Sequence, residues 1–328
     1  MNFIEAKEAF ERLFAEQMSQ DQMREFLLEM RLDETLEAQT IAAAAEVMSS
    51  YALMLDIRAD LKDSLIDIVG TGGDKSGSFN ISTTTAILVA SANLYVAKHG
   101  NRSITSKSGS ADLLETLGIR LDLSRSQSSV MLEECGFVFM FAQNHHPSMR
   151  HIMPIRKSID QKSIFNILGP LTNPAGVKRY LLGVFDAGFV RKMAEALLIN
   201  GALKAMVVSS ADGMDEISIS STTHAAILED DQIREFEIDP LLYGIKLAPF
   251  EAILGSSAEQ NASILLDIFN NRATDAQRDI VLINSAAAFI SAGVARDMQD
   301  GLEIAKEMLL SGKARDKLEQ IRSISSKL

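Results

Sequence analysis

The residues most suited to phosphate chemistry form the Gly-Thr-Gly-Gly-Asp run at 70–74, which directly follows a short apolar run at 65–69. Glycines let backbone N–H groups turn inward around an anion, and the polar residues at 80–84 would add amides and hydroxyls at the start of a helix. The run lacks the Gly-Lys-Ser/Thr of a Walker loop and the third glycine of a dinucleotide fingerprint. It predicts a phosphate-binding loop; the structural alternative is a tight turn with Ser82 or Asn80 as a helix cap.

A second polar group, the Lys-His-Gly-Asn-Arg run at 98–102, follows another short apolar run, and a serine-rich segment at 106–112 comes next. Open α/β sheets bind ligands at the carboxyl ends of their strands, so this group and the glycine run would lie at the same edge. Lysine and arginine there suit charge-assisted bonds to phosphate oxygens. Two such loops predict a ligand with more than one phosphate; a solvated basic turn with Ser110 as an N-cap is the alternative.

Acidic residues follow a later apolar run at 205–209, where Asp212 is succeeded by Asp215 and Glu216. Magnesium is typically held by one or two carboxylates together with water and ligand phosphates. The pair therefore predicts a magnesium site that would offset the repulsion between the carboxylates and a pyrophosphate. An acidic surface turn is the alternative.

Three of the five histidines lie within residues 145–151, and Arg156 follows them. Their spacing is not that of a zinc site, and Pro147 fits the first turn of a helix that would carry Arg156. Arg156 can bind a carboxylate bidentately or pair with a surface acid, and the sequence leaves both readings open. Covalent catalysis is not expected, because no Gly-x-Ser-x-Gly elbow is present and Cys135 lacks an activating context.

The elements that must position these residues change character along the chain. The first 60 residues contain no Gly or Pro and carry apolar side chains at helical spacing, with a capping box at 19–22 and a second long helix through 38–45. From about residue 64, short apolar runs that end in glycine or polar residues alternate with helical patterns, and from residue 258 the chain returns to helix. The pattern predicts an α/β protein: a small all-helical domain and a larger α/β domain whose central, mostly parallel sheet is flanked by helices. The apolar stripe of the first unit suits either the core or a dimer interface.

Composition narrows the classes of function. The 328 residues suffice for about two domains. The net charge of −12 disfavours generic binding to nucleic acid or to an anionic membrane surface. One cysteine, an acidic N-terminal segment and the lack of any run near the ~18 apolar residues of a membrane span lead us to expect a cytoplasmic protein.

These motifs, in their order and spacing, resemble the anthranilate phosphoribosyltransferase family, within the nucleoside phosphorylase and phosphoribosyltransferase-like group. The segments that carry the resemblance are 70–74, 80–83, 98–102, 108–112, 146–147, 165–174 and 215–216, with 282–288 and 311–314 nearer the C-terminus. The resemblance implies transfer of the 5-phosphoribosyl group of 5-phosphoribosyl 1-pyrophosphate to the amine of anthranilate, the second step of tryptophan biosynthesis. The products would be N-(5-phosphoribosyl)anthranilate and pyrophosphate.

The resemblance also implies domains, partners and roles. A helical dimerisation domain would span residues 1–63, joined by helices from about 147–175, and the phosphoribosyl-pyrophosphate-binding domain would span 64–328. A homodimer is implied, and association with a glutamine amidotransferase subunit of anthranilate synthase stays open. The positions implied to hold phosphoribosyl pyrophosphate are Gly70, Gly73, Asp74, Ser78, Asn80, Ser82, Thr83, Lys98, Ser106 and Ser110. Those implied to hold Mg²⁺ are Ser82, Asp215 and Glu216, and those implied to line the anthranilate path are Asn101, His146, Arg156 and Gly169.

Within that set, Lys98 and Arg156 would be the catalytic residues, Lys98 by neutralising the leaving group and Arg156 by orienting the anthranilate carboxylate. The chain departs from the family at residues 75–78, Lys-Ser-Gly-Ser, where relatives commonly have a glycine after the aspartate and a threonine before the phenylalanine. Two alternatives remain: an enzyme like the pyrimidine nucleoside phosphorylases, and a non-catalytic relative that binds nucleic acid. The net charge and the acidic pair disfavour the second.

Overall fold

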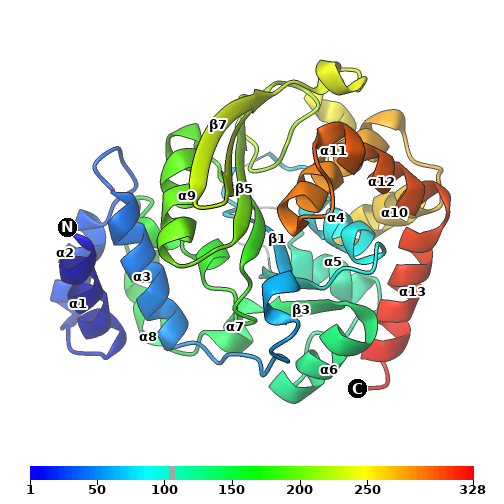
Figure 1. Cartoon of the computed structure of the whole chain (residues 1–328). Coiled ribbons are helices and arrows are strands. Elements are labelled where there is room, and N and C mark those ends of the chain that lie inside the picture. Colours follow the sequence, from blue (N-terminus) through cyan, green and yellow to red (C-terminus); the bar gives the residue numbers. More distant parts are fainter. Residues whose placement is uncertain (75, 103–107) are drawn as a thin grey trace.

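A single twisted sheet organises the computed structural model, which describes residues 1–74, 76–102 and 108–328 (Figure 1). Within those residues the sheet has seven strands in the order β3-β2-β1-β4-β5-β6-β7. The strands are β1 (Ile66–Gly70), β2 (Val96–Gly100), β3 (Phe137–Phe141), β4 (Arg179–Gly183), β5 (Lys204–Ser210), β6 (Thr223–Glu229) and β7 (Gln232–Ile238). The first five are parallel, which confirms the predicted mostly parallel sheet.

The antiparallel pair β6 and β7 is the part of the sheet that the sequence analysis did not anticipate. Its turn consists of Asp230 and Asp231, both at positive φ (50° and 56°). A two-residue hairpin turn needs positive φ at both central residues, and Asn-Gly or Asp-Gly is its usual signal. The Asp-Asp turn carries no glycine, so the hairpin was not apparent in the sequence.

Helices cover both faces of the sheet and extend beyond one end of it (Figure 1). Their bounds are α1 (Phe3–Phe14), α2 (Gln20–Glu29), α3 (Ala38–Ser50), α4 (Ile81–Ala90), α5 (Ser110–Thr116), α6 (Arg125–Cys135), α7 (Ala142–His145), α8 (Met149–Lys157), α9 (Val190–Ile199), α10 (Ala258–Phe269), α11 (Asp275–Ala292), α12 (Met298–Leu310) and α13 (Lys313–Ser325). None of the described helices has the length and apolar character needed to cross a bilayer.

Local signals explain several helix ends. Ser19 and Gln22 form the predicted capping box at the start of α2, and Gly136 in the left-handed conformation ends α6. Two expected starts were displaced. Gly109, not Ser110, precedes α5, and α8 begins two residues after Pro147.

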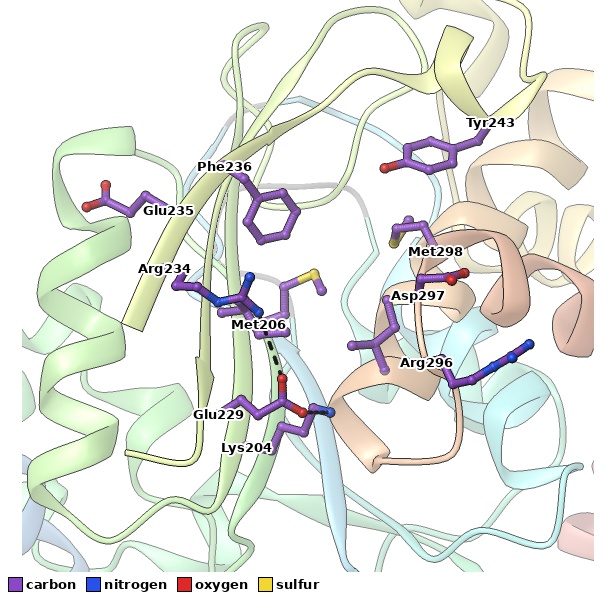
Figure 2. Close-up of a pocket in the computed structure, with 12 residues that line it drawn as sticks. Lys204, Met206, Glu229, Arg234, Glu235, Phe236, Tyr243, Arg296, Asp297 and Met298 are labelled. Atoms are coloured by element: carbon purple, nitrogen blue, oxygen red, sulfur yellow. Dashed lines mark hydrogen bonds and ion pairs between the residues drawn. The ribbon is translucent and has the colours of Figure 1, made fainter. Parts of the chain in front are cut away.

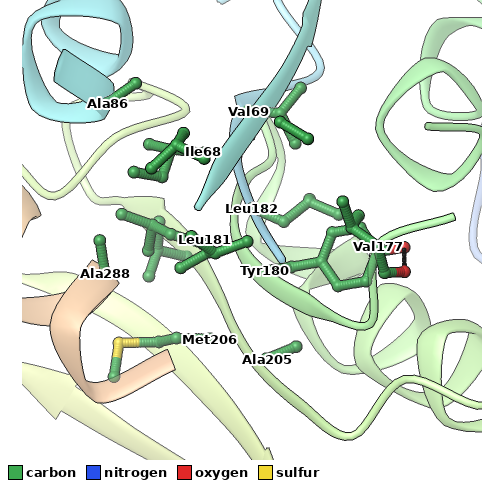
Figure 3. Packing of buried hydrophobic residues seen from close by; sticks show 14 of the residues in the cluster. Ile68, Val69, Ala86, Val177, Tyr180, Leu181, Leu182, Ala205, Met206 and Ala288 are labelled. Carbon is green, nitrogen blue, oxygen red and sulfur yellow. Dashed lines mark hydrogen bonds between the residues drawn. The ribbon is translucent and has the colours of Figure 1, made fainter. Parts of the chain in front are cut away.

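The core is built on the register of adjacent parallel strands. Ile68, Leu181 and Met206 occupy matching positions of β1, β4 and β5 and point to one face, where Ala86 of α4 and Ala288 of α11 cover them (Figure 3). All five side chains are at most 2% exposed. Small alanines on the covering helices let the helix backbones approach the sheet closely, so the strand ends that carry the polar residues are held rigidly.

The N-terminal helices pack against the segment after α7. Helix α2 lies against α8, Arg31 forms an isolated bridge with Ser163, and the Phe10 and Phe165 rings meet edge to face at 6.4 Å. Residues 1–63 therefore contact part of the 147–175 segment, as the predicted helical domain requires. The division of the chain into two domains stays a prediction.

Candidate functional site

The glycine run after β1 lies against the acidic turn after β5. Gly72 N–H donates a 2.6 Å hydrogen bond to Asp215 Oδ2. A Cβ on Gly70 would lie 2.3 Å from the same oxygen, and one on Gly183, at the end of β4, would lie 1.6 Å from the Asp215 carbonyl oxygen. Only glycine permits this approach, so the two glycines bring the acidic turn onto the edge of the sheet.

Asp215, which is buried, and Glu216, which is half-buried, place two carboxyl groups at this edge. Ser82 N–H, at the start of α4, donates a 3.1 Å hydrogen bond to Glu216 Oε1. Burial, together with the nearby Asp74 carboxylate, raises the pKa of Asp215 to about 7. Burial, together with Asp215, raises the pKa of Glu216 to about 8. The carboxyls therefore lie where negative charge is costly and a cation would be stabilised.

A divalent cation fits this donor set only in part. Across the described ranges, no group of three His, Cys, Asp or Glu side chains is arranged to hold a metal ion. Magnesium commonly keeps several waters and takes its other ligands from substrate phosphates, so two protein carboxylates suffice. The arrangement suits a cation that binds together with a phosphorylated substrate.

Lys98 in β2 supplies a fixed positive charge beside the carboxyls. Its side chain is 1% exposed, and its ammonium donates to the Ile68 carbonyl oxygen and, at 3.2 Å, to Ser82 Oγ. Burial lowers the pKa of Lys98, whereas Asp67, Glu216 and Asp215 act to raise it. The ammonium thus lies at the start of α4, between the β1 strand and the acidic pair.

Asp67 and Asn173 are two polar residues of this region that the sequence analysis did not select. Asp67 is wholly buried, and its carboxylate accepts from Asn173 Nδ2 (2.7 Å) and from His99 N–H (3.2 Å). Burial raises the pKa of Asp67 to about 7, and Lys98 opposes this. The available signal was an aspartate inside an apolar strand, since such a residue must find partners in the core.

The remaining residues expected to bind phosphate gather at the starts of α4 and α5. Thr83 Oγ1 donates to Ser110 Oγ (3.0 Å), and Asn80 Nδ2 donates to the Ser108 carbonyl (3.2 Å). Asn80 is the N-cap of α4, although its side chain makes no capping bond. The two helix starts are therefore joined through their side chains.

Three further positions expected on the phosphate side are Gly73, Ser78 and Ser106. Gly73 has positive φ (77°), and its carbonyl accepts from Lys162 Nζ at 3.4 Å. Ser78 forms an isolated bridge with Leu254. Ser106 and Lys75 lie outside the described residues.

A second cluster, around the loop that contains Gly169, contains two buried histidines. His99 Nδ1 lies 3.2 Å from the Gly169 carbonyl oxygen, and the His99 and His146 ring centroids are 5.2 Å apart. Burial lowers the pKa of His99 to about 3 and that of His146 to about 4. Both imidazoles are therefore neutral near pH 7.

His146 is buried, yet in the described part of the chain no hydrogen-bond partner has normal geometry for either ring nitrogen. The Thr172 backbone lies near enough to oppose the lowered pKa slightly. Arg156, half-buried on α8, likewise makes no hydrogen bond or ion pair with the described residues, and burial lowers its pKa. Buried polar groups normally have partners, so both side chains have unused capacity to bind a ligand.

Asn101 directly follows β2 and is bonded to Arg102 and to the start of α5. Its Oδ1 accepts from Arg102 N–H (2.8 Å), and its carbonyl accepts from Ala111 N–H (3.4 Å). The Arg102 guanidinium forms ion pairs with Asp112 (2.9 Å) and Glu115 (2.6 Å). Arg102 is thus already paired with two carboxylates, which differs from the phosphate-binding use that the basic run at 98–102 suggested.

A groove of about 590 Å³ lies elsewhere, at the end of the sheet where β5 begins (Figure 2). Figure 2 shows Phe236 and Tyr243 on either side of it, with Lys204, Glu229 and Arg234 below. Glu229 pairs with Lys204 (2.5 Å) and reaches Arg234 at 4.0 Å. Asp215 and Glu216 follow the opposite end of β5, so this groove is separate from the candidate site.

Comparison with known proteins gives this arrangement a family. A family model described as "Glycosyl transferase family, a/b domain" matches residues 62–315. An anthranilate phosphoribosyltransferase of Xanthobacter autotrophicus is 43% identical over 325 residues, covering 99% of this chain and 92% of the relative.

Two solved structures agree with this match. The crystal structure of anthranilate phosphoribosyltransferase from Thermus thermophilus has a TM-score of 0.91 at 36% identity, covering 99% of this chain and 96% of that chain. The enzyme from Saccharomyces cerevisiae, solved in complex with PRPP and Mg, has a TM-score of 0.84 at 27% identity, covering 94% and 86%. The sequence, the sheet and the residues at its carboxyl edge agree that this chain belongs to the anthranilate phosphoribosyltransferase family.

Proposed function

We propose that this protein transfers the 5-phosphoribosyl group from 5-phosphoribosyl 1-pyrophosphate to the amine of anthranilate, releasing pyrophosphate. The observation that carries the proposal is the buried Lys98 ammonium beside the carboxyl pair Asp215 and Glu216, all at the glycine run. A fixed cation and two cation ligands suit a pyrophosphate leaving group. Membership of the family supplies the acceptor, anthranilate.

Magnesium is the proposed cofactor, and Ser82, Asp215 and Glu216 would hold it. The yeast relative was solved with PRPP and Mg, and the two carboxyls with raised pKa values are the feature of this chain that supports the same ion. When bound, magnesium supplies positive charge that stabilises the departing pyrophosphate. Ser82 would contribute its hydroxyl oxygen, and the hydrogen bond from its N–H to Glu216 places it beside the pair.

The chemistry requires little proton transfer. The aromatic amine of anthranilate is already neutral near pH 7, so the main barrier is departure of pyrophosphate while positive charge grows on the ribose carbon. Lys98 offsets charge on the leaving group from a position fixed by two hydrogen bonds. Holding the two reactants in line can contribute ~7 to 11 kcal/mol.

The acceptor would bind at the second cluster. We propose that Arg156 binds the anthranilate carboxylate, and that Asn101, His146 and Gly169 line its path. The support is the unpaired guanidinium of Arg156 and the two unpartnered nitrogens of His146 within the described residues. A neutral His146 can donate one hydrogen bond and accept another. Because it carries no charge, it does not compete with Arg156 for the anthranilate carboxylate.

We further propose that the chain forms a homodimer through the helical unit of residues 1–63. Met1, Ile4 and Ile199 are apolar and 45–68% exposed, and a groove of about 440 Å³ lies between the N-terminus, α3 and α9. Sedimentation velocity tests this: a dimer that Ile4→Glu converts to a monomer supports it, and a wild-type monomer at micromolar concentration refutes it.

The activity is tested by the loss of anthranilate fluorescence on mixing the protein with anthranilate and phosphoribosyl pyrophosphate, with and without Mg²⁺. Loss that needs both substrates and the metal supports the proposal. A folded protein that binds phosphoribosyl pyrophosphate without consuming anthranilate would move the acceptor to another amine. Phosphorolysis of thymidine or uridine in place of transfer would indicate a nucleoside phosphorylase.

A further inference from the structure

A segment distant in sequence from the phosphate-binding loops is bonded directly to one of them. Phe79 N–H donates to the Ile253 carbonyl (3.1 Å), and Gly255 N–H donates to the Gly77 carbonyl (2.8 Å). Together with the isolated bridge of Ser78 and Leu254, these bonds lay residues 253–255 alongside residues 77–79. We call residues 253–261 the splint, because they are bonded along the loop that precedes α4.

The side chain of Asn261 extends the splint to Asn80. Asn261 is in the first turns of α10 and is 2% exposed. Its Nδ2 donates to Asn80 Oδ1 (2.9 Å), and its Oδ1 accepts from Ser256 N–H (2.9 Å). A buried amide with both ends engaged is a strong constraint on the groups that it joins.

The bonds also fix which way each amide faces. A backbone N–H can only donate, so the atom of Asn261 facing Ser256 must be its oxygen, and its nitrogen must face Asn80. Asn80 then presents its oxygen to Asn261 and its nitrogen to the Ser108 carbonyl, which can only accept. The chain of bonds runs in one direction from one backbone group to another, so neither amide can flip without placing like groups together.

Gly255 is required by the same close approach. A Cβ at this position would lie 2.6 Å from Phe79 Cα, 2.7 Å from Phe79 N and 2.8 Å from Asn261 Oδ1. Phe79 is 1% exposed and has no room to move away. Any side chain at residue 255 would separate the splint from the loop.

We propose that Asn261 is a positioning residue for the pyrophosphate-binding loop: it holds Asn80, and with it residues 77–80, in the arrangement that receives the phosphoribosyl pyrophosphate. This rests on the proposed function in naming the ligand. The proposal also explains how the chain can tolerate its departure from the family sequence at residues 75–78. Bonds from the splint hold the described residues 77–80 in place, so the loop does not depend on its own stiffness. Asn261 does not itself touch the substrate.

The test compares two substitutions of Asn261 with a control on the same helix. Asn261→Ala removes the amide without adding charge, and Asn261→Asp keeps the acceptor for Ser256 N–H and replaces the donor that faces Asn80 with a carboxylate oxygen. The control is Asn270→Ala, because the Asn270 amide donates only to the Leu266 carbonyl within α10 among its bonds to described residues. Each protein is titrated with phosphoribosyl pyrophosphate and Mg²⁺ by calorimetry, and amide hydrogen exchange is followed at residues 77–82 and 253–256.

Both Asn261 variants should weaken binding roughly three- to tenfold, the range of one neutral hydrogen bond, and leave kcat within about twofold. Exchange of the Phe79 and Gly255 amides should accelerate in both and stay unchanged in the control. Unchanged affinity and exchange in a folded Asn261→Ala protein would overturn the proposal. If the wild type binds no phosphoribosyl pyrophosphate, the proposed function fails, while the exchange comparison still decides whether Asn261 holds the loop. Should Asn261→Ala not fold, Asn261→Asp decides by the same measurements.

Discussion

The two clusters of the candidate site differ in how their polar groups are satisfied. On the phosphate side, Lys98, Asp215 and Glu216 all have hydrogen-bond partners within the chain. On the acceptor side, His146 and Arg156 have none of normal geometry among the described residues. The phosphate side is therefore already organised, whereas the acceptor side awaits a ligand that completes its bonds.

This difference matches the chemistry proposed for each side. Charge develops on the leaving pyrophosphate, and groups that are fixed before the reaction stabilise that charge without reorganising. Anthranilate has only to be held and aligned, so its residues need capacity to bind more than they need rigid partners. Changes on the phosphate side should thus lower the rate of transfer, and changes on the acceptor side should mainly alter anthranilate affinity.

Lys98→Met should have the largest effect. The variant removes the fixed charge beside the carboxyl pair, and we expect a loss in kcat/KM of about 10² to 10³, as for other preorganised electrostatic groups. The anthranilate fluorescence assay measures it. Lys204→Met is the matched control, because Lys204 begins β5 at the opposite end of the sheet and pairs with Glu229. Equal losses of kcat/KM in the two variants would mean that the loss comes from removing a buried lysine and not from the position of Lys98 at the site.

The double variant Asp215→Asn and Glu216→Gln should have the second-largest effect on activity. It keeps the shape of both side chains and removes the charge that a cation requires, so we expect the Mg²⁺ concentration for half-maximal rate to rise about a hundredfold. A magnesium titration of the initial rate tests this. Asp212→Asn, in the same turn, serves as the control, and an unaltered titration in the double variant would remove the pair from the metal site.

Arg156→Ala probes the acceptor side. Loss of one charged hydrogen-bonding partner should cost roughly 2 to 3 kcal/mol in transition-state binding, expressed mostly as a higher KM for anthranilate. Phosphoribosyl pyrophosphate affinity should not change, and this separation distinguishes Arg156 from Lys98. Lys157→Ala tests the neighbouring exposed cation on α8. Anthranilate kinetics like those of the wild type in Arg156→Ala would exclude the residue from the site.

Magnesium affinity should also depend on pH. Because the pKa values of Asp215 and Glu216 are raised to about 7 and about 8, both carboxyls are largely protonated at pH 6 and must lose their protons to bind a cation. The folded-state pKa values of these carboxyls are higher than the unfolded-state pKa, which is near 4. The protonated carboxyls therefore stabilise the metal-free protein fully when the pH is below about 4, and this stabilisation is lost as the pH rises to 8. Because both protons must be lost, the apparent Mg²⁺ affinity should increase about fiftyfold from pH 6 to pH 7. Thermal unfolding at each pH, with and without Mg²⁺, measures both trends, and a pH-independent shift by Mg²⁺ would contradict them.

The sequence predicted the phosphate side better than the acceptor side for a physical reason. A glycine run after a strand, a lysine after the next and an acidic pair after a third are each local signals, and parallel strands bring their carboxyl ends together. In the structure, hydrogen bonds join Gly72 to Asp215, Ser82 to Glu216 and Lys98 to Ser82. The three strand ends therefore lie together, in agreement with that reasoning.

Other features could not be inferred because they depend on contacts distant in sequence. The Asp67 and Asn173 bond spans 106 residues, and the Asn80 and Asn261 bond spans 181. No periodicity or turn signal connects such pairs. The β6 and β7 hairpin was missed because Asp230 and Asp231 carry positive φ without the glycine that normally marks it.

His146→Gln should have the smallest effect on activity. Burial holds the pKa of His146 near about 4, so the imidazole is neutral at working pH and glutamine replaces it without loss of charge. We expect the KM for anthranilate to change by roughly two- to threefold, the size of one weakened neutral hydrogen bond, and to stay flat from pH 6 to 8. His224→Gln, on the distant strand β6, is the control. A KM that falls or rises steeply across that range would show that His146 is charged in the complex.

The same variant should alter stability in acid, with a definite sign. A folded-state pKa below the unfolded-state value means that the unfolded chain binds more protons between pH 4 and 6.5, so the wild type loses stability as pH falls through that range. At pH 5 the His146 contribution to this loss is roughly 2 kcal/mol, and glutamine, which does not titrate, removes it. Urea unfolding of both proteins at pH 7 and pH 5 measures the difference. If the free energies of unfolding fall in parallel, His146 is solvated in the folded protein, and the contrast between an organised phosphate side and an unsatisfied acceptor side would then rest on Arg156 alone.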